Sequence, residues 1–146
     1  MGRRRKARES ALQILFQLEF DDTQVEKTVA QYWRGKRPSE KIKDYSTWLV
    51  KGIITHQKKI DSIIQSISDH WRISRMALVD RNILRIAVFE LLYEENISPA
   101  IIINEAIEIA KKYSSDEAAS FVNGVLDAVR KKIRMKEGSL KDGKND

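Results

Sequence analysis

The chain has 146 residues, enough for one domain with its own hydrophobic core. It is 42% hydrophobic and 33% charged with a net charge of +6, which favours a folded protein with some affinity for polyanions. The absence of cysteine excludes disulfides, thiolate-bound zinc and cysteine nucleophiles, and it fits a reducing compartment. No apolar run approaches the roughly 20 residues of a membrane span, and no secretory signal follows the basic N-terminus. We therefore expect a cytoplasmic protein without a membrane partner.

The hydrophobic pattern is helical from the N-terminus onward. The first helix follows a basic cluster directly, and the residues at helical spacing in it are Ala7, Ala11, Ile14, Leu15 and Leu18. Thr23 and Glu26 form a capping-box pattern, which predicts a second helix over residues 24–34. Gly35 and Pro38 mark the loop that follows.

A longer helix is predicted from Ser39, and its apolar face consists of Ile42, Tyr45, Leu49, Gly52 and Ile53. The apolar stripe resumes over Ile60–Ile67, either after a short break or along one continuing helix. Asp80 is placed to cap a further helix that ends near Tyr93.

The last third of the chain predicts two more helices. Ile101–Ile103 has strand-like composition, but no neighbouring segment could pair with it, so we assign it to a helix that ends near Tyr113. Ser114 and Glu117 form a second capping box, which opens the last helix. Residues 135–146 are predicted to be a disordered tail. The sequence thus predicts an all-α bundle of about seven helices, with one domain over residues 1–134.

Residues that perform catalysis or bind metals do not form a recognisable site. The two histidines, His56 and His70, match no metal-ligand spacing and are best explained as structural or solvated. The glycines form no phosphate-binding loop, and Ser10 has no nucleophile motif around it. We therefore predict a protein that is not an enzyme and uses no metal or cofactor.

The basic N-terminus is the candidate site. Its cations are Arg3, Arg4, Arg5, Lys6 and Arg8. Arginine side chains match phosphate oxygens and also stack on bases. Phe16 lies about two turns beyond Arg8, near Gln13, and could stack on an unpaired base. Two alternatives stay open: the cluster only adds solubility, and Phe16 belongs to the core.

The acidic residues that follow this cluster favour a short single-stranded or looped RNA over a long duplex. The chain also contains "VDRNILRIAVFELLY" and "INEAIEIAKKYSSDEAASFVNGVLDAV". Together with "RRRKARESALQILF", these segments resemble the NusB family of bacterial transcription antitermination factors, from about residue 3 to residue 134.

The resemblance implies an all-helical fold of two packed helical subdomains and a function without catalysis. It implies binding to boxA, a short RNA element of ribosomal RNA leaders. The implied protein partner is NusE, a small-subunit ribosomal protein that forms a heterodimer with the family. The pair helps load an antitermination complex on RNA polymerase.

The resemblance also assigns the RNA-binding positions. On the first helix they are Arg4, Arg5, Lys6, Arg8 and Phe16. The family usually has tyrosine at the last of these, so phenylalanine keeps the ring and loses a hydroxyl. Phe121 and Asn123 match a region near RNA, and Glu117 just before them is expected to weaken binding by repulsion.

Asp80 matches an acidic position that faces NusE in the family, and Arg81 and Arg85 are further candidates for that surface. Asp80 and Arg85 each have an alternative role inside the protein, since Asp80 is a natural helix cap and Arg85 could pair with glutamates inside the protein. Gly124 is expected to permit close helix packing, and Phe121 to lie at least half in the core.

Three other functions are compatible with the sequence. Similar helical domains precede RNA methyltransferases and position their substrate, although this chain ends without room for a catalytic domain. A protein–protein adaptor with a merely solubilising N-terminus is another alternative. A homodimer that hides the RNA-binding surface is the third, and its interface could use Trp33, Trp48 and Trp71.

Overall fold

The computed structural model describes residues 2–68 and 72–144, with side chains through Met135. These residues form seven α-helices and one 3-10 helix, with no strand among them. In chain order the elements are α1 (Gly2–Leu18), α2 (Val25–Trp33), α3 (Glu40–Thr55), α4 (Gln57–Ile67), η1 (Ile73–Arg75), α5 (Leu78–Tyr93), α6 (Pro99–Tyr113) and α7 (Asp116–Lys144). The predicted all-α fold of about seven helices is confirmed.

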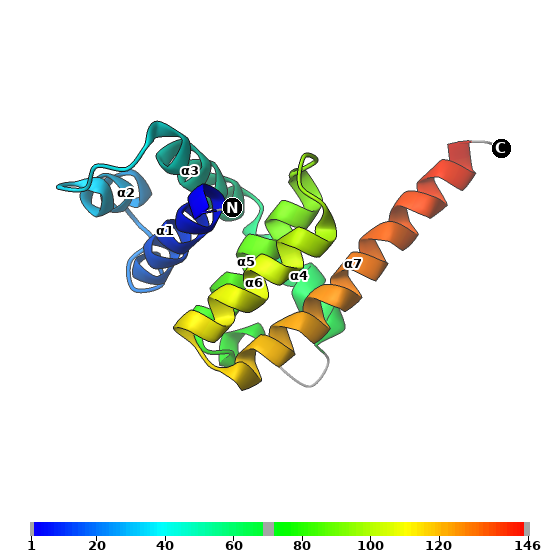
Figure 1. The fold of residues 1–146 in the computed structure, drawn as a ribbon. Coiled ribbons are helices and arrows are strands. Elements are labelled where there is room, and N and C mark those ends of the chain that lie inside the picture. Colours follow the sequence, from blue (N-terminus) through cyan, green and yellow to red (C-terminus); the bar gives the residue numbers. More distant parts are fainter. Residues whose placement is uncertain (1, 69–71, 145–146) are drawn as a thin grey trace.

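The helices form two groups around a shared core. Helices α1–α3 lie together on one side, and α4–α7 form the other side (Figure 1). Helix α5 joins the groups, because it packs against α1 and α3 as well as α4, α6 and α7. Its residues 82–90 are all buried, as expected for a helix surrounded by other helices.

The contact between α3 and α5 depends on a glycine. A Cβ atom built on Gly52 would lie 2.1 Å from Cζ of Phe89, a distance that real contacts do not allow. Glycine is therefore required here by the close approach of the Phe89 ring, which allows α3 to pack against the central helix.

The helix starts agree with the predicted positions better than with the predicted caps. Helix α3 begins after Ser39, whose hydroxyl caps it by accepting a hydrogen bond from the backbone N–H of Ile42 at 3.3 Å. Thr23 does not cap α2. Its N–H and hydroxyl instead donate to a carboxylate oxygen of Asp21 at 3.0 and 2.7 Å, which places Thr23 in an Asx turn before the helix.

The predicted caps of α5 and α7 are both displaced. Helix α5 begins at Leu78, so Asp80 lies in its first turn and is not the cap. A carboxylate in the first turn still interacts favourably with the helix dipole. At α7 the hydroxyl of Ser115, one residue after the predicted Ser114, accepts from the N–H of Ala118 at 3.0 Å.

The two segments left ambiguous by periodicity are both resolved. The segment Ile101–Ile103 lies in α6, whose first turn is fixed by a cap at Ser98 and by Pro99. The isoleucine stripe after α3 belongs to a separate helix, because α3 ends at Thr55 and α4 begins at Gln57. His70 and Trp71 lie outside the described residues.

Helix α7 continues to Lys144, through most of the segment predicted as a tail. Among the described side chains, Ile133 is the last along the chain that packs against the core, and Met135 is exposed. The proposed boundary after residue 134 and the disorder beyond it stay predictions.

Candidate nucleic-acid interface

The basic residues of α1 divide into exposed and internally bound groups. Arg3 and Lys6 are exposed, and neither forms an ion pair within the part of the chain that the structure describes. Arg5 and Arg8 each contact a glutamate of another helix, and Arg4 contacts Glu94 at the end of α5. Only part of the predicted cluster is therefore free to meet an external anion.

Arg8 is the most deeply buried of the predicted RNA-binding cations, with 3% of its surface exposed. Its Nε and Nη2 donate to the two carboxylate oxygens of Glu90 on α5 at 2.8 and 2.9 Å. The hydroxyl of Tyr45 donates to the same carboxylate at 2.6 Å. The guanidinium of Arg8 is thus bound inside the protein, where it anchors α1 on α5.

The charges of this cluster shift the pKa values of its members. Burial lowers the pKa of Arg8, but the hydrogen bond and charge of Glu90 outweigh burial and raise it above its ordinary value. Burial and the negative charge of Glu90 together raise the pKa of Tyr45. Arg8 stays charged and Tyr45 stays neutral at physiological pH, so the cluster keeps its hydrogen bonds.

Two further contacts join α1 to α6. Arg5 donates to both carboxylate oxygens of Glu105 at 2.7 and 3.0 Å. Glu9 accepts from Lys112 at 2.8 Å and from the hydroxyl of Tyr113. The hydrogen bond from Arg5 lowers the pKa of Glu105 below its ordinary value despite its burial. These contacts fix the orientation of α1 and hence the direction of its exposed face.

Arg4 lies between the internal and exposed groups. Its guanidinium lies over the ring of Tyr45, 4.3 Å from the ring centre, and donates to Glu94 at 3.2 Å. Its side chain remains well exposed. Arg4 can therefore present one face to solvent while it packs on the aromatic ring.

Phe16 lies on the surface and is not a core residue, with 37% of its surface exposed. The ring of Phe20, which is 72% exposed, contacts it edge to face at a centroid distance of 5.3 Å. Gln13 lies nearby on the same helix and accepts a hydrogen bond from the hydroxyl of Tyr32 at 3.1 Å. Phe20 is not among the residues predicted from the sequence, although its position four residues after Phe16 was a signal for it.

The candidates on α7 do not share one face. Glu117 is exposed, and Phe121 is half-buried and packs against the core as predicted. Asn123 is exposed but lies about 160° around the helix from Phe121, since each residue advances the helix by about 100°. Gly124 is exposed, and a Cβ atom placed on it would have no neighbouring atom within 4 Å, so the predicted close helix packing is wrong.

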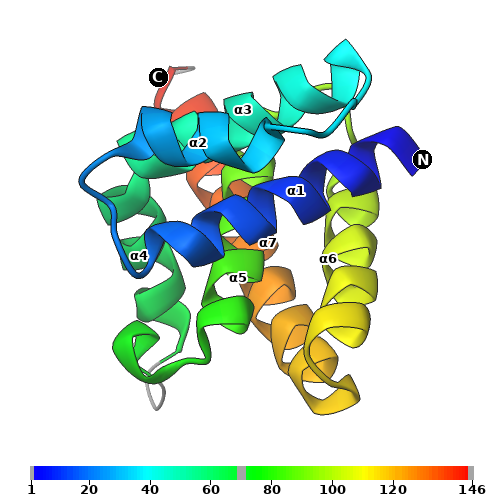
Figure 2. The same cartoon turned by 90° about the vertical axis from the view of Figure 1, so that its left-hand side faces the viewer.

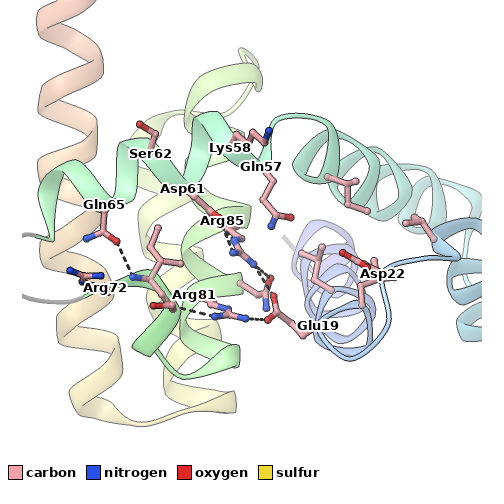
Figure 3. Close-up of a pocket in the computed structure, with 17 residues that line it drawn as sticks. Glu19, Asp22, Gln57, Lys58, Asp61, Ser62, Gln65, Arg72, Arg81 and Arg85 are labelled. Atoms are coloured by element: carbon pink, nitrogen blue, oxygen red, sulfur yellow. Dashed lines mark hydrogen bonds and ion pairs between the residues drawn. The ribbon is translucent and has the colours of Figure 1, made fainter.

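Two of the three candidates for a protein partner, Arg81 and Arg85, belong to an internal charge network (Figure 3). Arg85 donates to both carboxylate oxygens of Asp61 at 2.8 and 2.9 Å and to Glu19 at 2.9 Å. It is buried, which confirms the alternative role of pairing with acidic residues inside the protein. Arg81 pairs with the same Glu19, and burial together with the charge of Arg85 lowers the pKa of Arg81.

Beside this network lies a groove of about 820 Å³ between the end of α1, α4, η1 and α5. Glu19, Asp61 and Arg85 line it, together with exposed Lys58 and Arg72 (Figure 3). Asp80 lies half-buried on the adjoining first turn of α5, and its buried Oδ1 has no hydrogen-bond partner among the described residues.

The described residues contain no cluster of three or more His, Asp or Glu side chains placed to hold a metal ion. None of the described helices is both long enough and apolar enough to cross a membrane.

Comparison with solved structures gives several close matches. The structure of NusB from Thermotoga maritima superimposes with a TM-score of 0.79 at 36% identity, over 88% of this chain and 90% of that chain. A crystal structure of the antitermination factors NusB and NusE in complex with double-stranded RNA superimposes with a TM-score of 0.80 at 30% identity, over 90% of this chain and 98% of the matched chain.

Comparison of sequences agrees with the structural matches. The transcription antitermination protein NusB of Anaeromyxobacter dehalogenans is 44% identical over 129 residues, which cover 88% of this chain and 90% of the relative. That of Syntrophus aciditrophicus is 42% identical over 136 residues, covering 93% and 84% of the two chains. The model of the NusB family matches residues 5–131. The chain therefore belongs to the NusB family.

Proposed function

We propose that the chain is a non-catalytic transcription antitermination factor. In this proposal it binds boxA-type RNA of ribosomal RNA leaders as a heterodimer with NusE, and it helps load the antitermination complex on RNA polymerase. Its membership of the NusB family is the observation that supports this function most strongly. Because antitermination acts on RNA during its synthesis, we place the chain in the cytoplasm.

The RNA-binding surface in this proposal is the exposed face of α1. Arg3 and Lys6 contact phosphates, and Phe16 with Phe20 offers two rings on which unpaired bases can stack. Arg4 adds a partly exposed guanidinium. From α7, Glu117 and Phe121 lie one turn apart and border the RNA path in this proposal, with Glu117 weakening the attraction, whereas Asn123 lies on another face of the helix.

Two of the predicted RNA-binding cations are bound to glutamates of other helices, Arg8 as a buried side chain and Arg5 with 40% of its side chain exposed. Arg8 and Arg5 hold α1 against α5 and α6 through Glu90 and Glu105. Their substitution would weaken RNA binding by displacing α1, even where they make no contact with a phosphate. Variants of Arg3 and Lys6 therefore test contact with RNA, whereas variants of Arg5 and Arg8 also change the position of α1.

NusE is the proposed partner at the groove beside α5. Asp80 matches the acidic position that faces NusE in the family, and its side chain is only partly buried, so it is the direct contact we assign. Arg81 and Arg85 keep the wall of the groove in place through Glu19.

The test is a titration of labelled boxA RNA and of a scrambled RNA, with and without NusE, at several salt concentrations. We expect tighter binding to boxA and a further gain with NusE. The Arg3→Ala/Lys6→Ala variant should reduce the slope of log affinity against log salt by about 0.7 for each lost phosphate contact. Lys27→Ala/Lys58→Ala removes two exposed charges elsewhere and is the control for RNA binding without NusE.

Equal binding to both RNAs, unchanged by NusE, would reject the proposal and favour the adaptor function. Asp80→Asn tests the partner surface separately. This variant should reduce the increase in RNA affinity that NusE causes, while the affinity for RNA in the absence of NusE stays unchanged.

A further inference from the structure

A second basic and aromatic surface lies at the N-terminal end of α1, on the side of α3. It is a groove of about 1090 Å³, and the side chains that matter in it are Arg3, Arg4, Lys6, Lys41, Tyr45 and Trp48. Helix α3 supplies the last three, and none of them belongs to the candidate RNA-binding set.

The charge of this groove is positive. Four cationic side chains line it, from Arg3, Arg4, Lys6 and Lys41, against a single carboxylate from Asp44. Lys41 is exposed and forms no ion pair among the described residues. Such a surface attracts a phosphate backbone and repels cationic partners.

The aromatic wall of the groove is held in a fixed orientation. Trp48 is 38% exposed, and its ring packs against Phe89 at 4.8 Å and Tyr45 at 5.4 Å between centroids. Tyr45 is itself fixed by its hydrogen bond to Glu90 and by the guanidinium of Arg4 over its ring. An exposed indole held by packing offers a base a stacking surface at little cost in side-chain entropy.

The groove continues the candidate RNA-binding face. Phe16 and Lys6, which lines the groove, are ten residues apart on α1, about 15 Å along the helix axis. Gln13 is exposed between them, about 20° around the helix from Lys6 and about 60° from Phe16. Helix α1 runs past α2 and α3 toward its N-terminus (Figure 2). Because Arg3, Arg4 and Lys6 at that end line the groove, a strand that follows α1 from Phe16 reaches it.

We propose that this groove binds a flanking segment of the RNA, adjacent to boxA, by stacking a base on Trp48 and contacting phosphates with Lys41. The inference rests on the proposed RNA-binding function and extends it, because it assigns a second subsite to α3. Binding there depends on stacking and charge, so it is insensitive to the sequence of the flank.

The test compares a minimal boxA RNA with boxA RNAs extended by several uridines at the 5′ or the 3′ end, in fluorescence titrations. One of the extended RNAs should bind about tenfold more tightly than the minimal RNA, as expected for one stacked base. Trp48→Ala and Lys41→Ala should remove most of this gain and leave the affinity for minimal boxA unchanged. Trp48→Phe should retain part of it.

Lys41→Ala tests the same groove without removing a packed ring, because Lys41 is an exposed side chain of α3. A result shared by Lys41→Ala and Trp48→Ala is therefore not due to a folding defect in Trp48→Ala. Lys27→Ala removes one exposed charge on α2 and should keep the full gain. If neither extension adds affinity, or if Trp48→Ala and Lys41→Ala keep the gain, the second subsite is rejected while specific boxA binding stands.

A scrambled RNA with the same extensions separates this inference from the proposed function. A lack of preference for boxA rejects the proposed function. A gain from the extension that Trp48→Ala abolishes on the scrambled RNA still supports the groove as a binding site.

Discussion

Arg8 and Glu90 show how single residues connect the candidate site to the core. Both side chains are buried, and their charges are compensated mainly by each other and by Tyr45. Arg8→Ala would leave the carboxylate of Glu90 buried without its cation. We expect the free energy of unfolding to fall by about 3–5 kcal/mol, measured by chemical denaturation.

The control for this prediction is the double variant Arg8→Met/Glu90→Leu, which replaces both charges with apolar groups of similar length. It should recover most of the stability lost in Arg8→Ala. If Arg8→Ala were as stable as the parent protein, the ion pair would not be what holds α1 on α5.

Two helical glycines should respond to alanine in opposite ways. Gly52→Ala places a methyl group within the ring of Phe89 and should destabilise the protein by about 1–3 kcal/mol through overpacking. Gly124 is exposed with open space around it, so Gly124→Ala should stabilise the protein by about 1 kcal/mol through helix propensity. Thermal unfolding of the two variants side by side measures both effects, and a loss of stability in Gly124→Ala would contradict this account.

Glu117 tests the contribution of a negative charge beside the RNA path. Its exposed position in the first turn of α7 means that Glu117→Gln changes charge with little change in packing. We expect slightly tighter RNA binding at low salt, and a difference that shrinks as salt screens the repulsion. Equal or weaker RNA binding by Glu117→Gln would reject the prediction.

At the scale of elements, the orientation of α1 depends on its contacts with α6. Arg5 holds the pKa of Glu105 below its ordinary value, mainly through its hydrogen bond. A carboxyl group whose pKa is lowered in the folded state stabilises the protein at pH values above the ordinary pKa of that group, about 4.5. This contribution is lost as the pH falls through the lowered folded-state value.

Glu105→Gln should therefore be less stable than the parent protein at pH 7, and the difference should narrow below about pH 4. Denaturation curves at pH 7, 5, 4 and 3 measure this. Glu108→Gln, an exposed acid on the same helix, serves as control. A stability difference that stays constant with pH would show that Glu105 does not titrate with a lowered pKa.

Helix positions were predictable from the sequence, and helix starts were less so. Apolar spacing located the helical segments because burial of one face stabilises each helix, but it left open whether α3 and α4 are one helix or two. The caps of α2 and α5 were wrong because the side chains of Thr23 and Asp80 had alternatives: an Asx turn in one case, and a first-turn position in the other. Local pattern does not determine which of these a side chain adopts.

For the whole molecule, the length of the domain is testable at its C-terminus. Residues 135–146 contain three lysines and three acidic residues, so their removal leaves the net charge unchanged. We expect a chain that ends at Arg134 to unfold within about 2 °C of the full chain and to bind RNA equally well.

A chain that ends at Ala128 is the control, because it also loses Val129 and Ile133 from the core. It should be clearly less stable than the full chain. A large loss of stability on removal of residues 135–146 alone would place the domain boundary beyond residue 134.

The candidate site was only partly predictable, for a reason that concerns charge. The sequence located the basic cluster and the aromatic residue that follows it. It could not separate Arg3 and Lys6, which are exposed, from Arg8, which is bound to Glu90. Arg8 and Glu90 are 82 residues apart, and the spacing of residues within α1 does not indicate such a contact.

The sequence by itself determined the helical class, the positions of the helices and the family, because these depend on local periodicity and on motifs along the chain. Tertiary structure decided which charges face solvent and which neutralise one another, as Arg85 does with Asp61 and Glu19. It also decided that Trp48 and Lys41 share a groove with the start of α1. The physical reason is that a side chain's exposure depends on the neighbours that other helices bring to it.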